Sequence, residues 1–173
     1  MTPEVTFTTY LLAAAIAFGF GAIPVAYTVG RLYGVNVFEV GSRQAGATNV
    51  WREVSRKQGF IVTLIDATKG FTAIIMARQL GLDGAQLLVP VTAAVAGHWN
   101  SPFTRFRGGD GVVTMMGSSL AIAPVEVFVS AVIGKGESRH ADCSHDATLT
   151  NMLYDGLCDN AFSRRFVATL PVV

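Results

Sequence analysis

Long apolar stretches alternate with short charged loops over residues 1–134 of the chain. No Asp, Glu, Lys, Arg or His lies between Glu4 and Arg31. The apolar stretch 5–30 is long enough to cross a bilayer as one helix, because about 20 apolar residues are sufficient. Three more apolar stretches follow, at 59–77, 84–104 and 111–134. The pattern predicts an all-α fold, a polytopic transmembrane helix bundle with at least four spans.

Lys and Arg residues are concentrated in two of the loops between these spans. The loop at 31–58 contains Arg31, Arg43, Arg52, Arg56 and Lys57, and the loop after the third span contains Arg105 and Arg107. Since positively charged loops stay on the cytoplasmic side of a membrane, we expect both loops to be cytoplasmic and the N-terminus to lie outside. Both loops are also rich in glycine.

The composition supports a membrane protein and excludes several other classes. Only 14% of the residues are charged, against about 25% in an average soluble domain, and the mean hydropathy is +0.45. The net charge of +1 provides no basic surface field, so nucleic acid is not an expected partner. The 2 Cys cannot form a disulfide framework or a four-ligand zinc site, and we expect no metal and no cofactor.

Residues 135–173 differ in character from the rest of the chain. Charged residues become frequent again after Gly134, and no apolar stretch is long enough to span a membrane. We therefore divide the chain into a transmembrane domain, 1–134, and a polar C-terminal tail, 135–173. The tail is either divergent or the product of an altered reading frame.

Two ionisable residues fall inside the second apolar stretch, where a charge is costly. Asp66 and Lys69 are three residues apart, so a helix places them on one face within reach of an ion pair. Either the pair neutralises itself within the bundle, or Asp66 holds Lys69 at the edge of an anion site. His98 follows Gly97 near the cytoplasmic end of the third stretch, where it is either a packed side chain or part of a site.

The first cytoplasmic loop has the composition of a phosphate-binding loop. Its glycines allow tight turns that direct backbone N–H groups to one point, and its arginines can bind a phosphate through two parallel hydrogen bonds. An ordinary polar loop that follows the positive-inside rule would look similar. The candidate ligands in this loop are Gly41, Ser42, Arg43, Gly46, Thr48, Asn49 and Arg52.

The second loop contains a denser glycine cluster. It lacks the G-x-x-x-x-G-K-[ST] pattern of a Walker A loop. Asp110 stands inside the cluster, where its charge opposes an anion, so we expect it to pair with a neighbouring arginine or to bind a hydroxyl. A flexible turn is the alternative. Because both loops lie on one face of the membrane, a joint site for a phosphorylated ligand is favoured over a site in either loop alone. The candidate ligands here are Arg107, Gly108, Gly109, Gly111 and Thr114.

Several short motifs resemble one bacterial membrane family. They are Gly21-Ala22-Ile23-Pro24, Gly30-Arg31, Gly41-Ser42, Gly46-Ala47-Thr48-Asn49 with Arg52, Asp66 with Lys69-Gly70, Gly97-His98, and Phe106-Arg107-Gly108-Gly109-Asp110-Gly111-Val112-Val113-Thr114. In order and spacing, over about residues 12–125, this set resembles the PlsY family, the acyl-phosphate:glycerol-3-phosphate acyltransferases of the bacterial inner membrane.

The resemblance implies an enzyme of phospholipid synthesis. Such an enzyme moves an acyl chain from acyl phosphate to the 1-hydroxyl of glycerol 3-phosphate, giving lysophosphatidic acid and phosphate. Its implied partners are these two substrates and membrane lipid, without a metal or cofactor. Carried over by motif, the catalytic residues are Ser42, Arg52 and His98. The substrate-binding residues are Gly41, Arg43, Gly46, Thr48, Asn49, Lys69, Arg107, Gly108, Gly109, Gly111 and Thr114.

Two departures from the family pattern motivate an alternative function. Asp110 stands where the family has lysine, and a third cytoplasmic motif with His and Asn does not follow Gly134. The alternative is a non-catalytic membrane paralogue that binds a phosphorylated lipid or an anion. A small transporter fits less well, because the charged loops gather at one surface and do not line a path across the membrane.

Overall fold

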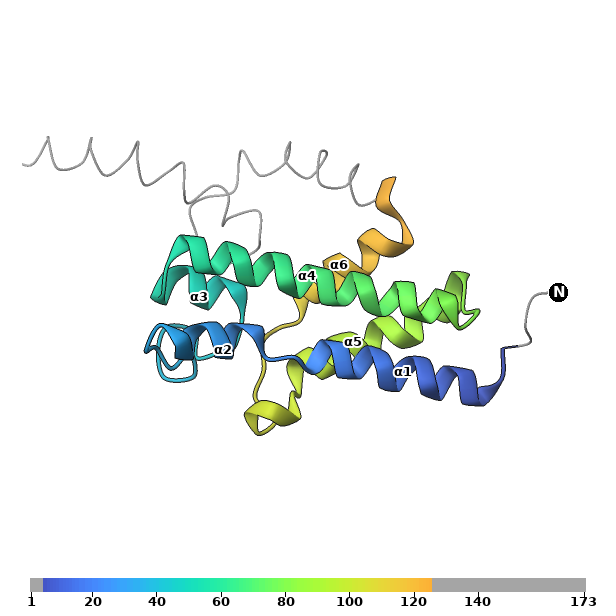
Figure 1. Cartoon of the computed structure of the whole chain (residues 1–173), viewed down its shortest axis with the longest axis horizontal. Helices are drawn as coiled ribbons and strands as arrows, with labels where there is room; N and C mark the ends of the chain where they lie inside the picture. The colour runs from blue at the N-terminus through green and yellow to red at the C-terminus, as the bar shows by residue number, and fades with distance from the viewer. Residues whose placement is uncertain (1–4, 126–173) are drawn as a thin grey trace, which may run out of the picture. The chain divides into compact units, whose positions relative to one another are not determined.

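The computed structural model describes residues 5–125, and every regular element in this range is a helix (Figure 1). The elements are α1 (Phe7–Ala22), α2 (Val25–Leu32), α3 (Ala47–Glu53), α4 (Arg56–Gln79), the 3-10 helix η1 (Gly84–Leu87), α5 (Leu88–Trp99), the 3-10 helix η2 (Pro102–Thr104) and α6 (Val112–Ile122). The all-α prediction is confirmed for this range. The predicted tail, 135–173, and the last part of the predicted fourth span, 126–134, lie outside the described residues.

Two helical stretches among the described residues are long and apolar enough to cross a membrane. They are Phe7–Leu32, which combines α1 and α2, and Arg56–Gln79, which is α4. These two stretches correspond to the first and second predicted spans. The helix α6 is also apolar, and it begins inside the predicted fourth span.

The third predicted span, 84–104, contains three helical elements, a division that the apolar pattern did not predict. The helices η1, α5 and η2 divide it, and the longest continuous piece is α5. With 12 residues α5 is about 18 Å long, which is shorter than the ~30 Å hydrocarbon core of a bilayer. Local signals explain the division. Asp83 and Gln86 form a capping box that starts η1, and Pro102 disfavours the helical conformation of Ser101.

The first predicted span is interrupted in its middle, which the apolar pattern did not predict. The helix α1 ends at Ala22, and α2 begins at Val25. Proline has no N–H to continue the helix and disfavours the α conformation of the residue before it, so α1 ends before Ile23 and Pro24. Thr28 then donates both its backbone N–H and its hydroxyl to the Pro24 carbonyl, each at 3.0 Å, within the first turn of α2.

Small side chains fill much of the interior of the bundle. The buried alanines of α1, α4, α5 and α6 are Ala13, Ala17, Ala22, Ala73, Ala77, Ala94 and Ala121. No Phe, Tyr or Trp side chain of residues 5–125 is buried, and many large apolar side chains are exposed, among them Phe7, Leu11, Leu12, Phe60, Leu64 and Leu88. A soluble protein buries such side chains, whereas helices in lipid pack through small residues and leave large apolar ones outside. The packing is that of a membrane protein.

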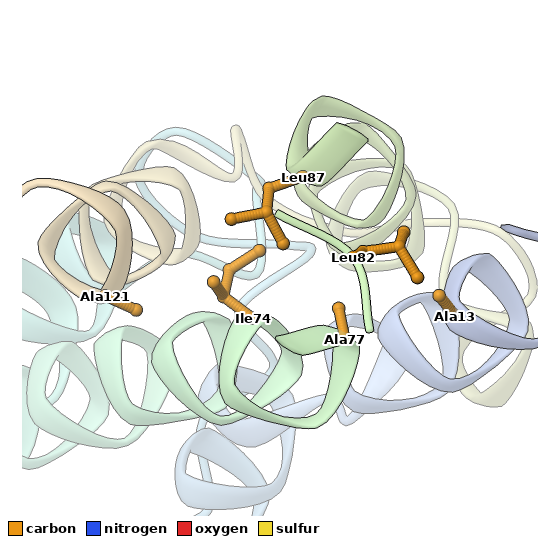
Figure 2. Close-up of a cluster of buried hydrophobic side chains, with 6 residues drawn as sticks. All are labelled: Ala13, Ile74, Ala77, Leu82, Leu87 and Ala121. Carbon is orange, nitrogen blue, oxygen red and sulfur yellow. The ribbon is translucent and has the colours of Figure 1, made fainter. Parts of the chain in front are cut away.

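One cluster of buried side chains joins three of the helices to the α4–α5 connection (Figure 2). It consists of Ala13 of α1, Ile74 and Ala77 of α4, Leu82 and Leu87 of the connection and η1, and Ala121 of α6. The cluster lies near the C-terminal end of α4, whereas the first Gly/Arg loop leads through α3 to its N-terminal end. The cluster therefore holds the helices together at the end of α4 that is opposite to the first Gly/Arg loop.

The helices α4 and α6 approach each other through reciprocal glycines. A Cβ added at Gly117 of α6 would lie 1.9 Å from the carbonyl oxygen of Ala67, and one added at Gly70 of α4 would lie 2.0 Å from the carbonyl oxygen of Thr114. Each helix thus places a glycine directly against the backbone of the other. Any larger residue at either position would push the helices apart.

The helices α1 and α5 make the same kind of contact. A Cβ at Gly21 would lie 2.0 Å from the carbonyl oxygen of Ala94, and one at Gly97 would lie 2.3 Å from the carbonyl oxygen of Phe18. This close approach brings the last turn of α5, and with it His98, against the end of α1 where the first span is interrupted.

A single methyl group tests the α4–α6 contact. We expect Gly117→Ala to lower the free energy of unfolding by about 1–3 kcal/mol or more, because its Cβ would collide with the backbone of α4. Gly19→Ala is the matched control: it also lies in a helix, but no atom lies within 4 Å of its added Cβ. Alanine is the better helix former, so this control should be neutral or stabilising by up to ~1 kcal/mol. Thermal unfolding in detergent measures both, and equal melting temperatures would contradict the contact.

Candidate functional site

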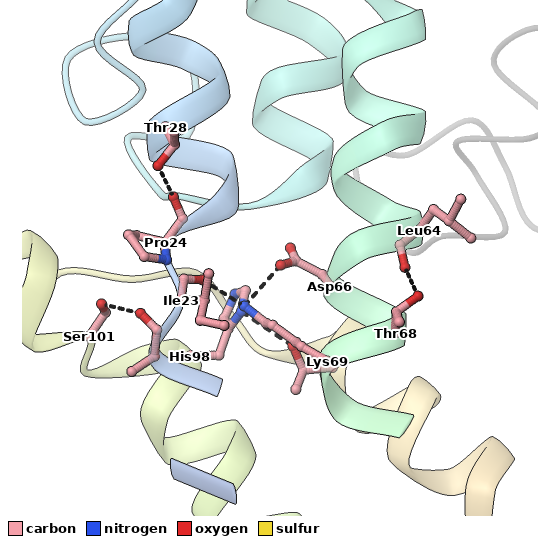
Figure 3. Close-up of polar contacts among 11 residues, drawn as sticks. Ile23, Pro24, Thr28, Leu64, Asp66, Thr68, Lys69, His98 and Ser101 are labelled. Atoms are coloured by element: carbon pink, nitrogen blue, oxygen red, sulfur yellow. Dashed lines mark hydrogen bonds and ion pairs between the residues drawn. The ribbon is translucent and has the colours of Figure 1, made fainter. Parts of the chain in front are cut away.

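The interruption between α1 and α2 leaves carbonyl groups without helical partners, and two distant side chains bind them (Figure 3). The Ser101 hydroxyl donates to the Ala22 carbonyl at 2.5 Å, and the Lys69 ammonium donates to the Ile23 carbonyl at 3.0 Å. Buried backbone carbonyls without a partner are costly, and in a membrane no water replaces the missing donor. Hydrogen bonds therefore connect the interruption to α4, through Lys69, and to the residues just before the second loop, through Ser101.

Lys69 is also paired with Asp66, as the spacing of the two residues predicted. The Lys69 Nζ lies 2.9 Å from the Asp66 Oδ1, and the two side chains are 4% and 1% exposed. Within the described part of the chain, Lys69 is the only residue that compensates the Asp66 carboxylate. The Lys69 ammonium thus has two partners, Asp66 and the Ile23 carbonyl. Both interpretations include this ion pair, and the Ile23 carbonyl is a second partner that the sequence did not predict.

His98 connects α5 to the start of α6 and to the second glycine loop. Its Nδ1 lies 3.3 Å from the Thr114 hydroxyl, and both side chains are buried. On the other side of the ring, a Cβ added at Gly109 would lie 2.6 Å from Nε2. Glycine at this position is what allows the loop to pass directly over the imidazole.

Asn49 organises the first loop from inside. Its side-chain amide donates to the carbonyls of Val37 (2.8 Å), Gln44 (3.0 Å) and Val40 (3.3 Å), and its Oδ1 accepts the backbone N–H of Ser42 at 3.2 Å. The side chain is 3% exposed. The loop is therefore folded around Asn49, whose hydrogen-bonding groups are used by the loop backbone.

The two Gly/Arg loops are joined by direct contacts. The backbone N–H of Ala45, in the first loop, donates to the carbonyl of Gly108, in the second, at 3.1 Å. The Arg107 guanidinium donates to the Phe38 carbonyl at 3.4 Å and lies over the Phe38 ring, 4.5 Å from its centroid. The predicted meeting of the two loops is thus present in the structure.

An open cleft of about 530 Å³ lies where the loops meet. Its polar lining residues are Arg43, Gln44, Arg107, Gly108, Gly109 and Asp110, and its aromatic ones are Phe38, Trp99 and Phe106. The volume is in the usual range of small-molecule sites, about 300–1,000 Å³. Two guanidinium groups and a glycine backbone are suited to a phosphate, and the cleft also contains one carboxylate.

A smaller cavity lies beside the interruption of the first span. His98 lines it together with Ile23 and Pro24, and Arg107 and Gly108 line both this cavity and the open cleft. His98 is thus placed behind the loop segment that carries Arg107. Ser101, which binds the Ala22 carbonyl, contributes to the same cavity.

The structure separates the predicted site residues into three groups. Those that line the open cleft are Arg43, Arg107, Gly108 and Gly109. Those buried next to it or in the helices beneath it are Asn49, Lys69, His98, Gly111 and Thr114. Those in the first loop and α3 that are not part of the cleft lining are Gly41, Ser42, Gly46, Thr48 and Arg52. Sequence reasoning missed Phe38, Trp99 and Phe106, although their position next to the Gly/Arg loops was a usable signal.

The packing and the cleft together define a class: a helical membrane protein with an open cleft lined by two arginines, glycine backbone and one carboxylate. Comparison with known proteins makes this specific. The family described as glycerol-3-phosphate acyltransferase matches residues 11–136 of the sequence. The chain belongs to this family, and the resemblance seen in the motifs is confirmed.

Curated relatives and a crystal structure agree with the assignment. Glycerol-3-phosphate acyltransferase 2 of Moorella thermoacetica is 40% identical over 125 residues, which cover 72% of this chain and 64% of the relative. Glycerol-3-phosphate acyltransferase 1 of Deinococcus radiodurans is 41% identical over 127 residues, again 72% and 64%. The crystal structure of PlsY, an integral membrane glycerol 3-phosphate acyltransferase, in its glycerol 3-phosphate form is similar with a TM-score of 0.70. That match is 30% identical and covers 94% of this chain and 79% of the other. The chain thus spans about 64% of the length of these curated relatives.

The buried ion pair gives a prediction about stability. Lys69→Met leaves the Asp66 carboxylate buried without its partner, and we expect this to lower the free energy of unfolding by about 3–5 kcal/mol. Lys57→Met, at an exposed position at the start of α4, removes the same charge and should cost less than ~1 kcal/mol. Melting temperatures in detergent compare the two variants. If Lys69→Met were as stable as Lys57→Met, the pair would not support the interruption of the first span.

Proposed function

We propose that the chain transfers an acyl group from acyl phosphate to the 1-hydroxyl of glycerol 3-phosphate, giving lysophosphatidic acid and phosphate. One observation carries the proposal: Arg43 of the first loop and Arg107 of the second line the same cleft, beside the Gly108–Gly109 backbone. Membership of the glycerol-3-phosphate acyltransferase family supplies the substrate class. Both substrates carry phosphate, and one carries a lipid chain, which suits a cationic cleft in a membrane protein.

The acyl transfer requires the protein mainly to position the two substrates. The substrate hydroxyl oxygen bonds to the acyl carbonyl carbon, the bond from that carbon to the phosphate oxygen breaks, and its electron pair leaves with phosphate. The hydroxyl proton ends on the departing phosphate. An acyl phosphate is already activated, so no protein nucleophile is needed. The rate is raised by holding the two substrates together and by cationic groups that face the negative charge developing on the phosphate in the transition state.

The three predicted catalytic residues differ in their position relative to the cleft. His98 does not line the open cleft but the smaller cavity behind Arg107, and we keep it as a residue of the inner part of the site. Ser42 and Arg52 carry the family motif, but both are exposed and neither lines the cleft. We therefore assign the direct phosphate contacts to Arg43 and Arg107 and keep Ser42 and Arg52 as residues of the outer part of the site.

A second candidate function is a non-catalytic membrane protein that binds a phosphorylated lipid or anion. The Asp110 carboxylate favours it, since a negative charge in the cleft opposes the binding of two phosphorylated substrates at once. The two functions differ in a product that can be measured.

Acyl transfer is tested with the purified chain, acyl phosphate and radiolabelled glycerol 3-phosphate. We expect labelled lysophosphatidic acid, with one phosphate released for each molecule formed. Arg107→Ala should raise the Kd for glycerol 3-phosphate at least tenfold, because it removes a charged hydrogen bond worth about 1.5–3 kcal/mol.

Arg105→Ala is the matched control for this variant. It removes the same charge two residues away, at an exposed position that is not part of the cleft lining, and it should leave the Kd unchanged. If glycerol 3-phosphate binds but no lysophosphatidic acid forms, the second candidate replaces the first. If Arg107→Ala and Arg105→Ala behave alike, the cleft is not the phosphate site.

We further propose that the chain lies in the bacterial plasma membrane, the inner membrane, with its N-terminus outside and both Gly/Arg loops in the cytoplasm. The distribution of Lys and Arg supports this orientation. Trp99, Phe103 and Phe106 beside the cleft are 65%, 71% and 67% exposed. Tryptophan is enriched where membrane meets water, so Trp99 supports a cleft at the membrane surface, within reach of both a soluble substrate and a lipid.

Cysteine labelling tests the orientation. In a background with Cys143→Ser and Cys158→Ser, single cysteines are introduced as Ala85→Cys, on the connection between α4 and α5, and as Phe103→Cys, in the second loop. A membrane-impermeant thiol reagent should label Ala85→Cys in spheroplasts and Phe103→Cys only after permeabilisation. The reverse pattern would contradict the proposed orientation.

A further inference from the structure

The open cleft contains a carboxylate, that of Asp110, which no residue within 5–125 neutralises. Asp110 lines the cleft with Arg43 and Arg107, and it is exposed. Within residues 5–125 its carboxylate makes no ion pair and no hydrogen bond, so of the two partners that the sequence predicted, a neighbouring arginine and a hydroxyl, the arginine is absent there. The Arg107 guanidinium is engaged instead with the carbonyl and ring of Phe38. Asp110 is therefore available to a ligand.

A free carboxylate has opposite effects on the two kinds of group that a ligand can bring. It repels phosphate, because like charges in a partly enclosed cleft oppose each other. It attracts a hydroxyl, because an ionised carboxylate is an acceptor only and forms strong hydrogen bonds with O–H donors. A cleft for phosphate alone would bind its ligand more tightly without Asp110. The combination of two arginines, a glycine backbone and one carboxylate is suited to a ligand with phosphate at one end and hydroxyl groups at the other.

We propose that Asp110 is a specificity-determining residue that accepts a hydrogen bond from a hydroxyl of the glycerol moiety. It makes the cleft selective for phosphorylated polyols over phosphate and over phosphate esters without hydroxyls. Arg43 and Arg107 bind the phosphate end, and Asp110 binds the hydroxyl end. This inference rests on the proposed function, because it takes glycerol 3-phosphate as the ligand of this cleft.

Two ligands of equal length separate the two effects. Glycerol 3-phosphate and n-propyl phosphate carry the same phosphate ester on three carbons, but only the first has free hydroxyls. In Asp110→Ala, n-propyl phosphate should bind several-fold more tightly, because the repulsion is gone. Glycerol 3-phosphate should gain nothing or bind more weakly, because it loses a hydrogen bond at the same time. The Kd for n-propyl phosphate divided by the Kd for glycerol 3-phosphate should therefore fall about tenfold or more.

The experiment measures both Kd values by calorimetry on the full chain in detergent. The variants are Asp110→Ala, Asp110→Asn, which keeps an acceptor without the charge, and Asp83→Asn as a control. Asp83 is 85% exposed and lies beyond the C-terminal end of α4, so it should leave the ratio unchanged. Asp110→Asn should retain part of the preference for glycerol 3-phosphate.

The outcomes distinguish this inference from the proposed function. If Asp110→Ala strengthens the binding of both ligands equally, Asp110 acts only as a repulsive charge and the inference is wrong. It is equally wrong if neither Kd changes, because Asp110 then lies outside the ligand site. Unmutated protein that does not bind glycerol 3-phosphate would overturn the proposed function together with the inference. If the unmutated protein binds glycerol 3-phosphate but Asp110→Ala leaves the ratio of the two Kd values unchanged, only the inference is overturned.

Discussion

The carbonyl groups at the end of α1 are the constraint on which the rest of the structure depends. Pro24 stops the helix, and inside a membrane the carbonyls of Ala22 and Ile23 need donors from elsewhere. Ser101 and Lys69 provide them. Because Lys69 carries a charge, it in turn requires Asp66 one helical turn earlier. The interruption at Pro24 thus gives the buried Lys69 ammonium and the Ser101 hydroxyl, in the turn between α5 and η2, their backbone acceptors.

The cleft follows from this arrangement and from the glycines of the helices. Gly97 lets α5 approach α1 so closely that His98 reaches the interrupted span. The second loop then passes over His98 at Gly109 and accepts a hydrogen bond from Ala45 of the first loop at Gly108. Arginine side chains from two loops far apart in the sequence therefore line one space. The position of the cleft is a consequence of close backbone contacts, not of the arginines alone.

Much of the fold could be predicted from the sequence, because a membrane imposes a length and a polarity on each span. The ion pair at Asp66 and Lys69 also followed from local spacing. What could not be predicted depends on partners far along the chain: that Lys69 binds the Ile23 carbonyl, and that Asn49 turns inward to hold the first loop. Composition marked both loops as phosphate sites but could not tell Arg43, which lines the cleft, from Arg52, which does not.

The central claim is that the two loops form one phosphate site, and a structure of the chain with glycerol 3-phosphate bound in a lipid environment tests it most directly. The account predicts that the phosphorus lies between the guanidinium groups of Arg43 and Arg107, against the Gly108–Gly109 backbone. It also predicts that a glycerol hydroxyl lies within hydrogen-bond distance of Asp110. A phosphate bound instead at Arg52 on α3, with the cleft between the loops empty, would contradict it.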